Sequence, residues 1–198
     1  MGMDLNVYRV DFDRLARIPG CRSERLLQQL IQFYEVEDEE AVEGDDDEEC
    51  EPEEQGLSVR DALRNVLFGT ISDRTPDPAY SQAMALIYPA IAAHIGDLRV
   101  AGWGIEAFFR DADVVLTRRG FPGYFSALVF AGCPLDVPVE AEPALGFISP
   151  AECERFGQEY SGHNWSAEEP SLQEVVEDLK TWCAEAARHR HGLVGVAP

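Results

Sequence analysis

Apolar residues recur with the 3.6-residue spacing of an amphipathic helix in several stretches of the chain. The first stretch predicts a helix that begins near Ser23. The second follows Ser58-Val59-Arg60-Asp61, which resembles a capping box, and ends at Gly69. The apolar positions of these two helices are Leu26, Leu27, Leu30, Ile31 and Tyr34, and then Ala62, Leu63, Val66 and Leu67.

Two longer helices are predicted further along. One follows Asp77-Pro78 and runs for four turns to Gly96, with Pro89 expected to kink it because proline lacks a backbone N–H. The other carries an apolar stripe from Leu172 to Ala187 and ends in a basic segment before Gly192. Between them, Ser149-Pro150-Ala151-Glu152 is a strong helix start.

Short segments rich in β-branched and aromatic residues predict the strands. They are Leu5–Val10, Leu98–Val100, Val114–Thr117, Tyr124–Phe130 and a closing strand from Leu193 to Ala197. Together, the elements predict a single α+β domain over residues 1–198, in which a small, mostly antiparallel sheet packs against several helices.

Charge changes the picture in one place. The chain has a formal net charge of -21, and fourteen of its 37 acidic residues lie in Glu35–Glu54, where there is no basic residue. Like charges repel and the segment has few apolar residues, so we expect a disordered acidic insertion at about 36–55. One interpretation is an electrostatic lure for a basic partner, and the other is a solvated loop that only raises solubility. The spacing does not match an EF-hand calcium loop.

Several classes of function have no support in the sequence. An acidic balance argues against nucleic acid and anionic membrane as partners. No apolar run reaches the length of a membrane span and no leader pattern opens the chain, so we expect a cytoplasmic protein. The five cysteines stand singly and read as free thiols. Without a nucleophile, metal or cofactor motif, we assign no catalytic residue, metal or cofactor.

Residues of three loop segments are candidates for a ligand site. Trp103 lies in a Gly-Trp-Gly turn, and Arg118 and Arg119 precede another turn, where they could bind an anion. His163 and Trp165 lie in a polar loop that offers hydrogen bonds and a stacking surface. The alternative is structural: the first two segments serve as turns between strands, and the tryptophan of the third anchors its loop against the final helix.

The order of these pieces is familiar. The opening MGMDLNVYRV, the helix YSQAMALIYPAIAAHIG, the passage PLDVPVEAEPALGFISPAE and the final helix with its closing strand resemble the YfbM-like group of uncharacterised bacterial proteins. The resemblance implies an α+β fold in a small intracellular protein of unknown activity, and it brings no catalytic residues. The acidic run is an addition to the pattern of that group.

Taken together, the sequence favours non-enzymatic recognition of a macromolecular partner, in its most specific form in the manner of an immunity protein that neutralises a basic toxin. The alternative is a small-molecule-binding or hydrolytic domain with a cleft lined by the candidate loops. The sequence leaves the oligomeric state open.

Overall fold

The computed structural model describes residues 3–41, 56–100, 105–140, 142–163, 165 and 170–197. Its strands are β1 (Met3–Val10), β2 (Ala93–Val100), β3 (Ala144–Ile148) and β4 (Gly192–Ala197). Its helices are α1 (Phe12–Leu15), α2 (Glu24–Ala41), α3 (Val59–Phe68), α4 (Pro78–Ile91), α5 (Ile105–Arg118), α6 (Tyr124–Phe130), α7 (Pro150–Glu159) with the 3-10 turn Tyr160–Gly162, and α8 (Pro170–His189). The predicted α+β class is confirmed.

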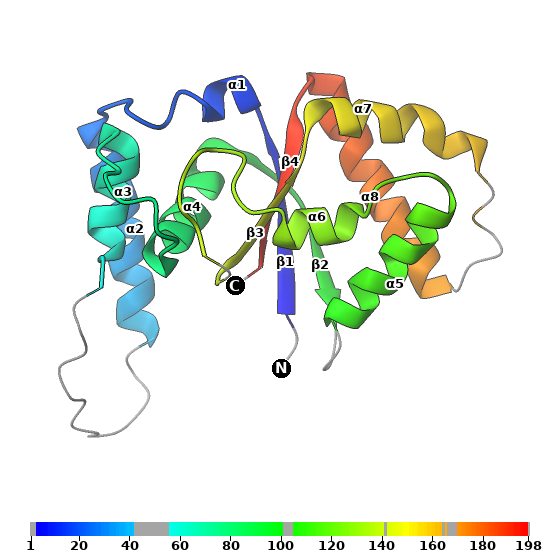
Figure 1. Ribbon diagram of the computed structural model, residues 1–198, viewed down its shortest axis with the longest axis horizontal. Coiled ribbons are helices and arrows are strands. Elements are labelled where there is room, and N and C mark those ends of the chain that lie inside the picture. Colours follow the sequence, from blue (N-terminus) through cyan, green and yellow to red (C-terminus); the bar gives the residue numbers. More distant parts are fainter. Residues whose placement is uncertain are drawn as a thin grey trace.

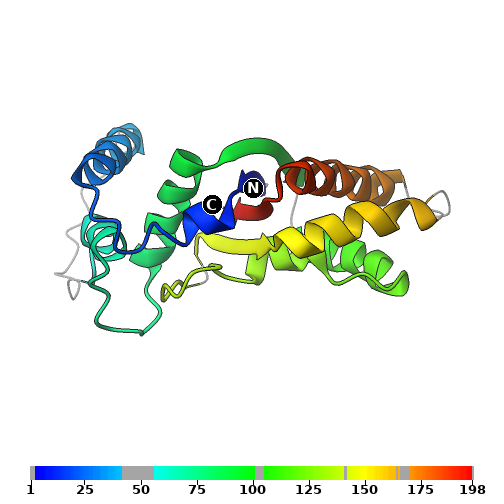
Figure 2. The same ribbon diagram turned by 90° about the horizontal axis from the view of Figure 1, so that it is seen from above.

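The strands form an antiparallel sheet in the order β2-β1-β4-β3, within the described ranges. Successive side chains alternate between its two faces. Leu5, Val7 and Leu193 pack against α5 to α8 on one face, whereas Val10 and Val194 pack with α1 to α4 on the other. Figures 1 and 2 show these two helical layers on either side of the central sheet. The domain therefore has two buried clusters, one on each side.

Three glycines share one row across the sheet, two of them beneath α6 and the third, Gly96, against Trp182 of α8. In the register of the strands, Gly96, Val7, Gly195 and Gly146 stand side by side on β2, β1, β4 and β3. A Cβ on Gly146 would lie 2.0 Å from the carbonyl oxygen of Ala127 in α6. The missing side chains thus let a helix backbone approach the sheet directly.

The expected strands at Val114–Thr117 and Tyr124–Phe130 are wrong, because these residues lie in α5 and α6. Short apolar runs do not distinguish a strand from a buried helix by periodicity alone. On α5 the buried residues Phe109, Ala112 and Leu116 recur at helical spacing. This pattern extends over more residues than the short segment Val114–Thr117 from which a strand was predicted. Ala144–Ile148, in contrast, forms an unpredicted strand, β3.

Helix α6 obtains its N-terminal cap from a distant residue. Its N-cap, Gly123, has no side chain to offer, and the Asp113 carboxylate on α5 instead accepts the backbone N–H groups of Phe125 at 2.9 Å and Ser126 at 2.8 Å. Asp113 is only 8% exposed. A buried carboxylate therefore ties α5 to the start of α6.

The predicted ends of two helices need correction. Helix α4 ends at Ile91, soon after Pro89, and Ile95 and Gly96 belong to β2 rather than to the helix. Helix α2 continues to Ala41, so residues 35–41 are helical where a loop was expected. Glutamate and alanine are good helix formers, and here they extend a helix that its apolar stripe has already begun. The remainder of the expected loop, residues 42–55, lies outside the described residues.

Candidate functional site

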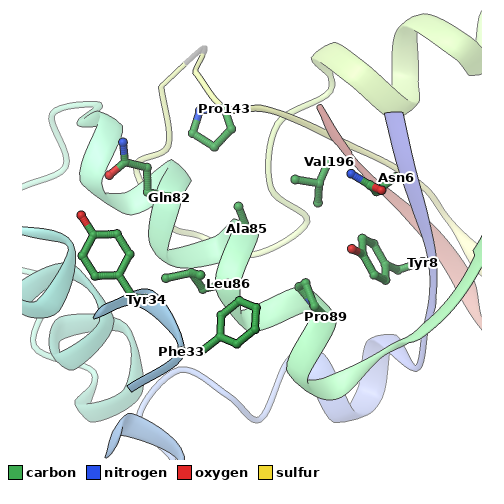
Figure 3. A pocket seen from close by; sticks show the side chains of 10 residues that line it. All are labelled: Asn6, Tyr8, Phe33, Tyr34, Gln82, Ala85, Leu86, Pro89, Pro143 and Val196. Atoms are coloured by element: carbon green, nitrogen blue, oxygen red, sulfur yellow. The ribbon is translucent and has the colours of Figure 1, made fainter. Parts of the chain in front are cut away.

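A groove opens between α2, α4 and the sheet. It consists of two adjoining cavities of about 360 Å³ and 330 Å³, which share Phe33, Leu86 and Pro89. The first cavity is also lined by Asn6, Tyr8, Tyr34, Gln82, Ala85, Pro143 and Val196, and the second by Leu26, Gln29, Leu30 and Ala90. Figure 3 shows the first cavity, with Leu86 and Phe33 between the helices and Tyr8 on the side of the sheet.

Helix α4 packs into the core with one face and lines the groove with another. Ala83, Met84, Ile87 and Tyr88 are buried in the core on this side of the sheet. One step around the helix, Leu86 is half-buried and Pro89 is exposed, and both line the groove. The core contacts therefore fix the helix, and its second face remains available to a ligand.

Phe33 is the large hydrophobic side chain most open to solvent among the described residues that line this groove. It projects from α2, is 53% exposed and lines both cavities. The other half-buried and exposed lining residues, such as Leu26 and Leu86, surround it with further apolar surface. Contiguous apolar surface of this kind is typical of a binding site in a soluble domain.

The wall on the side of the sheet carries two polar side chains beside the apolar Val196. Asn6 and Tyr8 lie on β1, two residues apart, and Figure 3 shows the hydroxyl of Tyr8 directed into the cavity on the side of α4. Among the described residues, neither side chain has a hydrogen-bond partner. Burial raises the pKa of the Tyr8 hydroxyl, and the nearby Asp97 adds to the shift, so the hydroxyl is a neutral donor at physiological pH.

A β-bulge brings a histidine and an aspartate to the edge of this wall. The pairing of β1 with β2 shifts between Val7 and Tyr8, so that Tyr8 pairs with His94 while Asn6 pairs with Asp97. The ring of His94 meets that of Tyr8 edge-on at 5.4 Å, and its Nε2 lies 2.6 Å from Asp97 Oδ1. Neither residue lines the cavities, so this pair supports Tyr8 rather than the groove itself.

Charged side chains begin immediately beside the groove in the sequence. Among the residues that the structure describes, no Asp, Glu, Lys or Arg lines either cavity. On α2, however, the groove residues Phe33 and Tyr34 are followed directly by Glu35, the first residue of the acidic run. An apolar groove and a dense negative charge therefore meet on one helix.

The structure brings three of the five predicted site residues together, on the other side of the molecule. The guanidinium carbon of Arg119 lies 4.7 Å from the ring centre of Trp165, and the rings of His163 and Trp165 are 5.9 Å apart. Arg118 is exposed at the end of α5, and Trp103 lies outside the described residues.

Trp165 is held by other aromatic rings. It stacks on Tyr160 at 5.0 Å and on Phe121 at 6.2 Å, and its Nε1–H donates to the Tyr160 carbonyl at 3.2 Å. These contacts agree with the structural interpretation of an aromatic anchor, with Tyr160 and Phe121 as its ring partners. A ligand site here stays a prediction.

Sequence reasoning missed the groove, although part of its signal was present. Leu26, Leu30 and Tyr34 were assigned to the stripe of a buried helix, and Phe33 lies beside that stripe. An aromatic residue next to a helical stripe widens the apolar face beyond what a core contact requires. The contributions of Asn6 and Val196 depend on strand pairing and have no local signal.

Comparison with known proteins identifies the family. Residues 1–197 match the family model described as Domain of unknown function (DUF7691), and the chain belongs to that family. No curated protein and no solved structure matches the chain. Among the described helices, none is both long and apolar enough to cross a membrane. The described residues also contain no group of three His, Cys, Asp or Glu side chains placed to hold a metal ion.

Proposed function

We propose that the protein is a non-enzymatic binding protein whose groove between α2 and α4 recognises an apolar segment of a basic protein. The observation that carries the proposal is the half-exposed Phe33 over an uncharged groove, on the same helix that leads into the acidic run. In its most specific form, the partner is a basic toxin and the protein neutralises it as an immunity protein does.

Apolar burial and electrostatic attraction make different contributions to the proposed binding. Each large apolar side chain that enters the groove contributes about 1.5–3 kcal/mol when fully buried. The acidic residues add speed and selectivity, because opposite charges steer association and like charges reject an acidic competitor. Binding should therefore weaken with salt but persist in part, since salt screens the charges and leaves the apolar contact in place.

We also propose that the chain is related to the YfbM-like group. Its support is the set of sequence segments quoted above, and it implies a bacterial, cytoplasmic setting. A partner encoded in the same cell, or delivered to it by a competitor, fits that setting.

A displayed library of random peptides tests the proposal without knowledge of the partner. We expect the full chain to enrich peptides that combine Leu, Ile or Phe with Lys or Arg, and Phe33→Ala to weaken their binding at least about tenfold, as for other exposed aromatic anchors. Phe130→Ala is the matched control, because Phe130 on α6 is 56% exposed and lies outside the groove. Enrichment of acidic peptides, or equal binding by the Phe33→Ala protein, would contradict the proposal.

A further inference from the structure

The two long walls of the groove have the same periodicity. On α2, Leu26, Leu30 and Phe33 line the groove at positions i, i+4 and i+7. On α4, Gln82, Leu86 and Pro89 repeat this spacing. Seven residues of helix span about 10 Å. Each wall therefore presents a row of side chains two helical turns long, against which a segment of a partner can pack.

A helix satisfies the chemistry of these walls better than an extended strand. Most backbone groups of α2 and α4 are bonded within their helices, although Pro89 has no N–H to offer the Ala85 carbonyl, and the walls they present are mainly apolar. An extended peptide would leave its own N–H and C=O groups unpaired against such a surface, at a cost of about 1–3 kcal/mol for each buried group. A helix bonds its backbone internally and packs its side-chain ridges into the groove.

Charge along α2 favours a basic occupant at one end. Arg22 precedes the helix and Arg25 follows Glu24 in its first turn, whereas residues 35–40 at the other end include five acidic residues and no basic one. The helix dipole also places partial negative charge at the C-terminal end. Basic groups on an occupant are thus attracted beside Tyr34, where the apolar lining ends.

We infer that the groove between α2 and α4 binds an amphipathic, basic helix of the partner, with apolar side chains at i, i+4 and i+7 entering the two cavities on either side of Phe33. This inference rests on the proposed function and specifies the conformation of the segment. Recognition then follows the helix-in-groove mode, in which spacing matters as much as composition.

Three synthetic peptides of equal length test the inference by fluorescence anisotropy with the full chain. The first has Leu at i, i+4 and i+7 in a background of Lys and Ala, the second has the same composition with Leu at alternate positions, and the third replaces Lys with Glu in the first pattern. We expect the first to bind at least about tenfold more tightly than either of the others. Phe33→Ala should remove this preference, and Phe130→Ala should preserve it.

The peptide results distinguish a failure of the helical conformation from a failure of the groove as the binding site. Equal binding of the first and second peptides, with both weakened by Phe33→Ala, overturns the helix and leaves the groove as the binding site. Binding of the first peptide that Phe33→Ala does not change overturns the proposed function as well. Failure of all three peptides to bind also overturns both.

Discussion

Gly146→Ala should destabilise the domain by more than about 3 kcal/mol, because the new methyl group has no space to enter. It would lie 2.0 Å from the Ala127 carbonyl oxygen and 2.4 Å from the carbonyl carbon of Leu128. Both are backbone atoms of α6, so no side-chain rotation relieves the clash, and the helix must move away from the sheet. Urea unfolding followed by circular dichroism measures the loss.

Gly157→Ala provides the matched control. Gly157 lies in α7, and a Cβ there would meet no atom within 4 Å. Alanine should stabilise an exposed helical position by about 0.5–1 kcal/mol, since glycine loses more backbone freedom on folding. A Gly146→Ala protein as stable as the wild type would show that α6 does not rest on the sheet as described.

The second large effect is expected at Asp113. Asp113→Ala removes the acceptor of two backbone N–H groups at the start of α6, those of Phe125 and Ser126. Each buried donor left without a partner costs about 1–3 kcal/mol, so we expect a total loss of about 2–6 kcal/mol. Asp113→Asn should lose less, because its side-chain oxygen can still accept.

Asp111→Ala tests whether the loss is specific to the cap. Asp111 is on the same helix but exposed, and its replacement should change stability by less than about 0.5 kcal/mol. Amide hydrogen exchange of α6 adds a local readout, because protection at Phe125 and Ser126 should fall first in the Asp113→Ala protein. Equal losses in the Asp111 and Asp113 variants would contradict the assigned role.

Elements defined by local chemistry could be predicted from the sequence. Ser58 caps α3 and Gly69 ends it in the left-handed conformation, as their positions beside an apolar stripe indicated. Ser149 and Glu152 form the expected capping box at the start of α7. These features require only residues within a few positions of one another, so a local sequence pattern is sufficient to predict them.

Elements defined by distant contacts could not be predicted. The first turn of α6 depends on Asp113, and its own N-cap, Gly123, offers no side chain that marks a helix start in a segment whose aromatic and β-branched residues predicted a strand. Strand β3 contains a central glycine, Gly146, whose use appears only when α6 lies across it. In both cases the determining partner belongs to another element, and no local pattern identifies it.

The candidate site divides in the same way. The negative charge beside the groove is a property of composition and was found in the sequence, along with the idea of a basic partner. The groove itself joins α2 to α4 and to strands at both ends of the chain, so its existence depends on the tertiary fold. The loops around Trp165 attracted attention because they are polar and aromatic, whereas their rings pack mainly on one another.

Amide NMR spectra of the full chain, titrated with the helical Leu/Lys peptide, locate the binding surface residue by residue. If the groove between α2 and α4 is the binding surface, the largest shift changes should occur at Phe33, Leu86 and Ala90, with little change at Arg119 and Trp165. Changes centred on Arg119, His163 and Trp165, or spread evenly over the charged surface, would contradict the account and place binding elsewhere on the molecule.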